Sequence, residues 1–477
     1  MKRHNNAIKF LSLFLIGAFL FSSCSDWFDE SPKTDLKADK MFENEEGFQN
    51  ALTGIYLLLT SANTYAGNMS FGLLDQLAQE YDYVPDGVQD INAIYNYKTS
   101  TTNGYQSKQK ITASWQAMYN VIANCNNLIK WLDKRGTTVV TDEQERNMLR
   151  GEALAIRAFC HFDLLRAWGP WNYRNNAKAA ATETIPYRTV ADNSKQPRLA
   201  AKEVLNRIEK DLLAARDLLA YEKDVKLKGS DRRYRFNYHA ITALLARVYG
   251  FMGAQEKAVE LAKEVISKSG LELQTTNQND PILFSECICG LNMYQMEDGL
   301  SSRWAIGDKF TTQYVISQKK FDALFEVSGS RRDDMRSKTS AFYTYDTQQL
   351  ALSKKYNTNQ KEVIPLIRLP EMYYILCEFT TDNERSRSYL NYVRNRRGYS
   401  AALNEKYTDM AGRLKALDKE YRKEYYGEGQ YWYFLKAHGY TSIPYAADIT
   451  LTEERYVFPL PDAEVQYGWV ESETASN

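Results

Sequence analysis

Apolar side chains recur at intervals of three or four residues along several segments of this 477-residue chain. In segment 42–59, Phe48, Leu52, Ile55 and Leu59 follow that spacing, which places them on one face of a helix. Similar patterns predict further helices, at 115–132, 143–168, 202–219, 238–252 and 255–267. We therefore predict an all-α, mainly helical fold.

The last two of these helices form a pair joined at Gly253, and their small residues follow the spacing of a tetratricopeptide unit. A weaker copy covers 372–392, and generic helix-hairpin patterning is the alternative for both copies. One pair cannot bury its apolar face alone, so the repeat predicts that the pairs stack on the other helices.

Two long stretches lack this periodicity, at 63–107 and 271–362. Segments of this length without regular structure are usually functional when they lie inside a compact domain. We expect one domain at 41–477, with helix-pair repeats at 41–270, a loop-rich part at 271–362 and a C-terminal part at 363–477.

The N-terminus has the features of a secretory signal. Residues 10–21 form an almost unbroken apolar run behind a basic start, too short to span a bilayer, and Ser22-Ser23-Cys24 follows. This pattern predicts a lipoprotein signal peptide at 1–23, acylation of Cys24 and an acidic tether at 24–40. Several acyl chains would anchor the protein to a membrane, facing out of the cytoplasm. The alternative is an ordinary signal with a chance cysteine.

Composition excludes several classes of site. Lysine plus arginine and aspartate plus glutamate total 60 each, so the chain lacks the basic surface that a nucleic-acid partner requires. Cys125, Cys160 and Cys377 lie among apolar residues and are predicted to be core residues. Cys287 and Cys289 suit neither a zinc knuckle nor a redox pair.

Several ordered motifs resemble the SusD/RagB family of outer-membrane nutrient-binding lipoproteins of the Bacteroidetes. They are Trp115-Gln-Ala-Met-Tyr119, Gly151-Glu-Ala-Leu-Ala-Ile-Arg-Ala-Phe159, Arg368-Leu-Pro-Glu-Met-Tyr373, Leu390-Asn391 with Val393-Arg394, and Phe458-Pro-Leu-Pro461 with Glu464. The chain departs from the family at Tyr431 and Phe434, where arginine and aspartate are usual. We expect aromatic packing there in place of an ion pair.

This resemblance implies a SusD-like fold, with tetratricopeptide-like helix pairs on one side and an irregular ligand-binding half. It also implies a partner, a SusC-like TonB-dependent transporter of the outer membrane, over which the lipoprotein closes as a lid. Asp26, Asp29 and Glu30, directly after the cysteine, resemble the family's signal for export to the cell surface, and a solvated linker is the alternative.

The two irregular stretches hold the candidate ligand-binding residues. Tyrosine offers a flat face for the C–H groups of a sugar, while short polar side chains can bind its hydroxyls. The candidates are Tyr81, Asp82, Tyr83, Tyr95, Asn96, Tyr97, Tyr105, Tyr294, Arg303 and Trp304. The alternative is that the tyrosines at 81–83 and 95–97 belong to short strands and pack on the body of the protein.

Two groups of charged residues could be mistaken for active sites. We interpret Glu152, Arg157 and Asp163 as charges that fix helix packing. Glu420, Glu424 and Glu428 share one helix face, and a carboxylate pair could hydrolyse a glycoside, but neighbouring basic residues favour solvated or paired charges.

We therefore expect no catalysis. The protein would capture an oligosaccharide, or a peptide, for a transporter. A helical-repeat scaffold that binds only protein and a surface glycoside hydrolase are the alternatives. We expect no cofactor, although a structural calcium ion near the acidic loops stays open; no loop has the spacing of an EF-hand.

Overall fold

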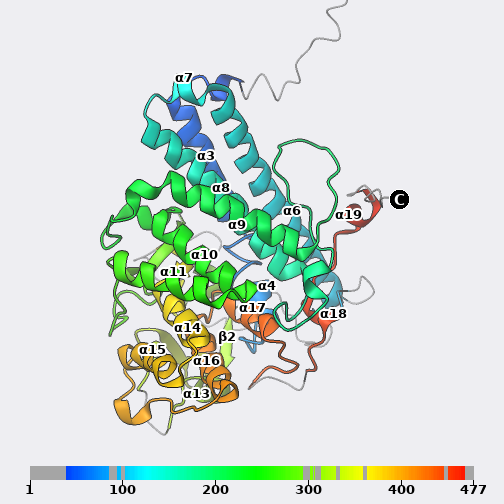
Figure 1. Ribbon diagram of the computed structural model, residues 1–477. Helices are drawn as coiled ribbons and strands as arrows, with labels where there is room; N and C mark the ends of the chain where they lie inside the picture. The colour runs from blue at the N-terminus through cyan, green and yellow to red at the C-terminus, as the bar shows by residue number, and fades with distance from the viewer. Residues whose placement is uncertain are drawn as a thin grey trace, which may run out of the picture.

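The computed structural model describes residues 39–84, 94–97, 102–293, 301–304, 306, 313–328, 333–357, 362–444 and 449–467. Its long helices form one continuous stack in which each packs on the next, running from top to bottom of Figure 1. They are α3 (Glu45–Leu59), α6 (Thr102–Trp131), α8 (Glu143–Trp168), α9 (Ala201–Leu218), α10 (Tyr238–Met252), α11 (Gln255–Lys268), α14 (Leu369–Phe379) and α15 (Asn383–Arg396). The mainly helical prediction is confirmed. In the described residues, no helix has both the length and the apolar character needed to cross a bilayer.

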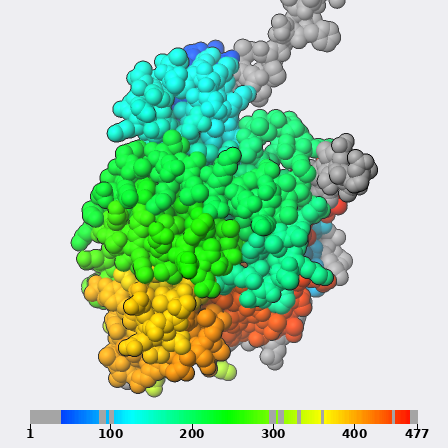
Figure 2. Space-filling view, viewed as in Figure 1, coloured from blue at the N-terminus to red at the C-terminus, as the bar shows by residue number. Residues whose placement is uncertain are grey.

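The C-terminal part of the chain runs beside this stack rather than extending it. Its helices are α16 (Met410–Glu424), α17 (Gln430–Ala437), α18 (Glu453–Tyr456) and α19 (Asp462–Tyr467). In the space-filling view the early helices lie at one end and residues of α14 to α16 at the other (Figure 2). Segments distant in sequence are therefore brought together along one side of the stack.

Both predicted helix pairs are present, as α10 with α11 and α14 with α15. Gly253 ends α10 in the left-handed region, at φ +80°, which a glycine adopts without strain and which turns the chain into α11. Helix α6 begins at Thr102, earlier than the predicted start near residue 115. The pattern did not predict this extension because its first turns are polar and show little periodicity. Buried Ile111 nevertheless packs this extension into the core.

Helix α8 is buried on every side from Gly151 to Trp168. A Cβ at Gly151 would lie 2.0 Å from Leu219 Cδ1, so this glycine allows close packing against the end of α9. Glu152 pairs with Arg232 at 2.6 Å, and Arg157 pairs with Asp211 at 2.7 Å. The prediction that these motif charges fix helix packing is confirmed.

The loop-rich part contains short strands that periodicity did not reveal. Strand β1 (Cys287–Asn292) pairs antiparallel with β5 (Val363–Arg368), and β2 (Val315–Ser317), β4 (Leu350–Ser353) and β3 (Phe342–Tyr345) form a second sheet in that order. Most of these strands are buried on both faces, so they lack the apolar–polar alternation of a half-exposed strand. All five described cysteines, including Cys287 and Cys289, are buried free thiols.

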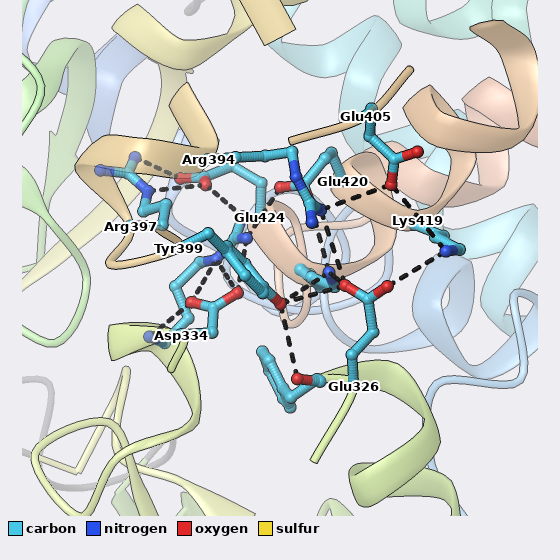
Figure 3. Close-up of polar contacts among 12 residues, drawn as sticks. Glu326, Asp334, Arg394, Arg397, Tyr399, Glu405, Lys419, Glu420 and Glu424 are labelled. Carbon is cyan, nitrogen blue, oxygen red and sulfur yellow. Dashed lines mark hydrogen bonds and ion pairs between the residues drawn. The ribbon is translucent and has the colours of Figure 1, made fainter. Parts of the chain in front are cut away.

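A network of buried charges joins the loop-rich part to α16 (Figure 3). The carboxylate of Glu424 contacts three guanidinium groups, Arg368 at 2.5 Å, Arg336 at 2.8 Å and Arg397 at 2.9 Å. Glu420 pairs with Arg394 at 2.6 Å and with Arg336 at 2.8 Å. Glu428 lies beyond the end of α16, so the expected shared helix face holds only for Glu420 and Glu424, but its carboxylate is also paired, with Lys355 at 2.6 Å and Arg368 at 2.9 Å. All three glutamates are therefore paired, as one of the two interpretations held, and they are not solvated.

These contacts determine what the carboxylates can do. Burial alone would raise the pKa of Glu420 and Glu424, but the neighbouring arginines and, for Glu420, Lys423 hold both values below the ordinary one. A glycosidase general acid needs the opposite, a raised pKa and an accessible proton. This glutamate face is structural.

A second buried pair attaches the segment after α4 (Leu73–Leu77) to α16. Glu80 accepts a hydrogen bond from Nε of Arg422 at 3.1 Å, and both side chains are almost completely buried. Burial outweighs the attraction of Arg422 and raises the pKa of Glu80 to about 7. This pair should make stability depend on pH.

Glu424→Gln should strongly destabilise the protein, because it leaves buried guanidinium charge without its carboxylate. We expect a loss of about 3–5 kcal/mol in the free energy of unfolding, measured by urea denaturation. The control is Glu203→Gln, which removes an exposed pair with Arg207 and should change stability by no more than about 1 kcal/mol. Equal effects of the two changes would contradict the role of the network.

Glu80→Gln should remove a pH-dependent part of stability. The folded pKa of Glu80, about 7, lies above its ordinary value of 4.5, so its protonation favours the folded state. That contribution is complete below pH 4.5 and is lost as the pH rises through 7. The stability of the native protein minus that of the variant should therefore fall between pH 5 and pH 8, by about 1.4 kcal/mol per unit of pKa difference. A stability difference that stays constant with pH would disprove this role of Glu80. The control is Glu454→Gln, which changes an exposed carboxylate and should give no such pH dependence.

Candidate functional site

Tyr81 and Trp304, predicted from different stretches, do come together, but they meet inside the protein. Their ring centroids lie 6.1 Å apart, and Tyr314 and Tyr426 pack on Tyr81 at 4.7 and 5.5 Å. Tyr81 is 6% exposed and Trp304 is fully buried. Both side chains are part of an aromatic core cluster.

Tyr95 and Tyr97 are also packing residues. Tyr95 donates a hydrogen bond to the carbonyl of Leu77, and Tyr97 donates one to the carbonyl of Arg455 at 2.7 Å. Both rings are at least nine-tenths buried. Their surroundings match the alternative in which tyrosines pack on the body, although the segment 94–97 forms no strand. A ligand cannot reach these rings without a rearrangement.

The remaining described candidates keep some exposed surface: Asp82, Tyr83, Asn96, Tyr105 and Arg303. The carboxylate of Asp82 is already engaged, since it pairs with Lys320 at 2.6 Å and accepts a hydrogen bond from the backbone N–H of Ser317. Although partial burial acts against it, the hydrogen bond from Lys320 lowers the pKa of Asp82. Asp82 therefore holds its segment against β2 as an ionised carboxylate.

Among the described predicted tyrosines, Tyr105 on α6 is the most exposed, at 44%, and partly exposed Tyr83 is the one that lies on a sheet with further tyrosines. Tyr83 forms an antiparallel bridge with Val315 of β2, which pairs with Leu352 of β4, which in turn pairs with Tyr343 of β3. Residues directly opposite one another point to the same face of a sheet, so Tyr83 and Tyr343 share a face. Val315 and Leu352 between them are buried. The two tyrosines thus end a row that crosses the sheet.

Tyr345 joins this face from the same strand as Tyr343. The two rings meet edge to face with centroids 4.8 Å apart, and the hydroxyl of Tyr345 donates to Oε1 of Gln313 at 3.0 Å. Tyr343 is 36% exposed. We did not predict either residue, although the alternation Phe-Tyr-Thr-Tyr before Asp346 is a strand signal. Tyr83, Tyr343 and Tyr345 are called the tyrosine face below.

A polar hollow of about 590 Å³ lies where the hairpin of β3 and β4 begins. Its lining consists mainly of hydroxyl, amide and ammonium groups from Thr275 to Asn279, Thr339, Ser340, Lys338 and Lys354. Such groups can bind sugar hydroxyls, but the hollow offers no aromatic face. It lies within the stretch predicted to be functional.

Some expectations fall outside the described residues. Cys24 and Tyr294 lie there, as do Asp26, Asp29 and Glu30. Across the described ranges, no group of three or more histidine, cysteine or acidic side chains is arranged to hold a metal ion. At the C-terminal departure from the family pattern, Phe434 stacks on Tyr421 at 4.5 Å, and the hydroxyl of Tyr431 donates to Asp418 at 2.7 Å. The expected aromatic packing is confirmed.

Comparison with known proteins agrees with this architecture. A family model described as "Starch-binding associating with outer membrane" matches residues 26–250, and one described as "SusD family" matches residues 289–436. A SusD-like protein of Bacteroides ovatus is 25% identical over 330 residues, which cover 65% of this chain and 52% of that protein. A SusD-like protein of Formosa agariphila is 25% identical and covers 60% and 50%. The chain spans about half, or less, of the length of these curated relatives.

Solved structures share the fold at low sequence identity. A SusD superfamily protein from Bacteroides thetaiotaomicron superposes with a TM-score of 0.68 at 21% identity, covering 89% of this chain and 98% of that one. A SusD-like carbohydrate binding protein from Bacteroides vulgatus gives 0.69 at 17% identity, covering 89% and 96%. The motifs, the family models and the fold agree: this chain belongs to the SusD/RagB family.

Proposed function

We propose that this protein is an outer-membrane lipoprotein that binds a glycan at the cell surface and delivers it to a SusC-like TonB-dependent transporter. Family membership supports the general role, and one solved relative is described as carbohydrate binding. The observation that carries the proposal is the tyrosine face. Partly exposed tyrosines on a rigid sheet suit sugar rings, whose polarised C–H groups pack on aromatic faces.

Polar groups lie near this sheet, although outside its strands. Asp82, next to Tyr83 in the sequence, forms an ion pair with Lys320 beside β2, and partly exposed Arg303 accepts a backbone hydrogen bond from Tyr314. A sugar needs such donors and acceptors around its ring to fix its orientation. The buried aromatic cluster that includes Tyr81 and Trp304 reaches this sheet through Tyr426, which packs on Tyr81 and on Phe342 of β3, the residue next to Tyr343.

Two alternatives belong to other classes of protein. A scaffold that binds only protein would capture a partner but no glycan, and a surface hydrolase would release cleavage products from a glycan panel. A peptide ligand is a third outcome for the same surface. Isothermal titration and affinity electrophoresis against glycans, with product analysis and pull-down of the transporter, distinguish them.

Tyr343→Ala and Tyr83→Ala should each weaken binding of the glycan found in such a panel by about five- to tenfold, because each removes an aromatic face worth about 1–1.4 kcal/mol. Tyr392→Ala is the matched control, since this tyrosine is 44% exposed on α15, away from the sheet. Unchanged affinity in both test variants would contradict the site. If Lys338→Ala and Lys354→Ala abolished binding instead, the polar hollow would be the site.

Cys24→Ser should abolish labelling by a clickable palmitate analogue and release the protein from the outer membrane, since acyl chains on this thiol are the proposed anchor. The Tyr343→Ala variant should keep the label and the surface location while it loses glycan affinity. Protease treatment of intact cells gives the location. A labelled Cys24→Ser protein, or a native protein that surface protease never reaches, would refute the anchor.

A further inference from the structure

The polar hollow and the tyrosine face are connected through the hairpin of β3 and β4. The backbone N–H of Lys354 donates to the carbonyl of Ala341 at 2.7 Å, which extends the pairing of these strands by one residue. Side chains alternate between the two faces of a strand, so Lys354 starts from the same face as Leu352 and Tyr343. Diagonal neighbours such as Tyr343 and Lys354 lie about 7–8 Å apart. Since Lys354 also lines the polar hollow, one oligosaccharide can contact both places.

The walls of the polar hollow are fixed from inside. The side chain of Asn277, which is almost completely buried, donates to the carbonyl of Met335 at 3.1 Å and accepts from the hydroxyl of Ser340 at 2.5 Å. One amide thus connects segment 275–279 to segment 335–340. The volume of about 590 Å³ lies within the range of roughly 300–1,000 Å³ that is typical of ligand sites. The hollow therefore has room for a ligand and walls that are in place before it arrives.

The polar hollow carries positive charge. Two lysines, Lys338 and Lys354, contribute to its lining, and none of the described residues that line it is acidic. The carboxylate of Asp280, in the same stretch of chain, is occupied elsewhere, since it accepts from the backbone N–H groups of Phe284 and Ser285 at 2.8 and 3.0 Å. Within the described ranges, neither lysine forms an ion pair. The hollow thus offers ammonium groups that no carboxylate of its lining neutralises.

The ammonium group of Lys354 is held in place at the hollow. It donates to the carbonyl of Thr339 at 2.6 Å, which leaves two of its three N–H donors for a ligand. Lys338 precedes Thr339 and is exposed. A neutral hydroxyl group can accept from either lysine, but an anionic oxygen forms charge-assisted hydrogen bonds, which are about twice as strong. Two ammonium groups in one hollow therefore favour a negatively charged group.

We propose that the glycan bound by this protein is acidic, and that its carboxylate or sulfate group binds Lys338 and Lys354 in the polar hollow while its sugar rings pack on the tyrosine face. This inference rests on the proposed function and names the substrate class of the same surface. The hydroxyl and amide groups of segment 275–279 bind hydroxyl groups of the sugar that carries the charge. Uronic acids and sulfated sugars present the same kind of anionic oxygen.

Isothermal titration of acidic glycans and their neutral counterparts tests this proposal. The probes are oligogalacturonate and alginate oligosaccharides with their carboxyl-reduced forms, and sulfated galactan and fucan oligosaccharides with their desulfated forms. At least one acidic probe should bind about tenfold or more tightly than its neutral form, and added salt should weaken only the acidic probe. Binding of a carboxylate probe identifies a uronic acid as the source of the charge, and binding of a sulfated probe identifies a sulfate ester.

Lys338→Gln and Lys354→Gln each remove a charge from a side chain with exposed surface, so the fold should be unaffected. Each should weaken binding of the acidic probe by about three- to tenfold and leave the neutral form unchanged, whereas Lys354→Arg should keep most of the affinity. Tyr343→Ala should weaken both forms alike. Lys263→Gln is the matched control, since this lysine is exposed on α11 and does not line the hollow, and it should change neither affinity.

A neutral form that binds as tightly as its acidic probe would overturn the acidic substrate, and so would native affinity for the acidic probe in both lysine variants. Binding of neutral glycans alone would have the same meaning, and in all three cases glycan binding itself would stand. If no glycan of either kind binds, the proposed function fails, and this inference fails with it.

Discussion

The contact between Glu424 and three arginines is the interaction on which the arrangement of the C-terminal half depends. Arg336 comes from the loop-rich part, Arg368 from the end of β5, and Arg397 from directly after α15. One carboxylate on α16 therefore fixes three segments that meet nowhere in the sequence, and Figure 3 shows its contact with Arg397. Charges this deeply buried are stable only when each has its partners, so the position of every segment depends on the others.

Aromatic packing complements this network on the side of the irregular segments. Phe71, Tyr81, Trp304 and Tyr356 form one cluster, which fills the space between the segment after α3 and the strands. The high tyrosine content is thus largely a packing device, with hydroxyls that bond to nearby carboxylates and carbonyls, as in Tyr65 and Tyr97. Irregular chain needs such anchors because it has few backbone hydrogen bonds of its own.

The tyrosine face lies on a small sheet at the surface, where large molecules can approach and where partly exposed rings supply contact area. Strand pairing holds this sheet, and Phe342 of β3 packs on buried Tyr426. A rigid support of this kind positions the tyrosine side chains before any ligand arrives.

The helices, the repeat pairs and the family motifs could be predicted from the sequence, because helical periodicity and motif spacing are local properties. The structural role of Glu152 and Arg157 was also predictable. Strands β1, β4 and β5 were not, since burial on both faces erases their alternation. For the candidate site, the sequence indicated aromatic loops that meet, and Tyr81 and Trp304 do meet. Only the tertiary structure decided that these rings are buried while Tyr83 and Tyr343 are accessible. Exposure depends on which distant segments cover a side chain, and no local pattern contains that information.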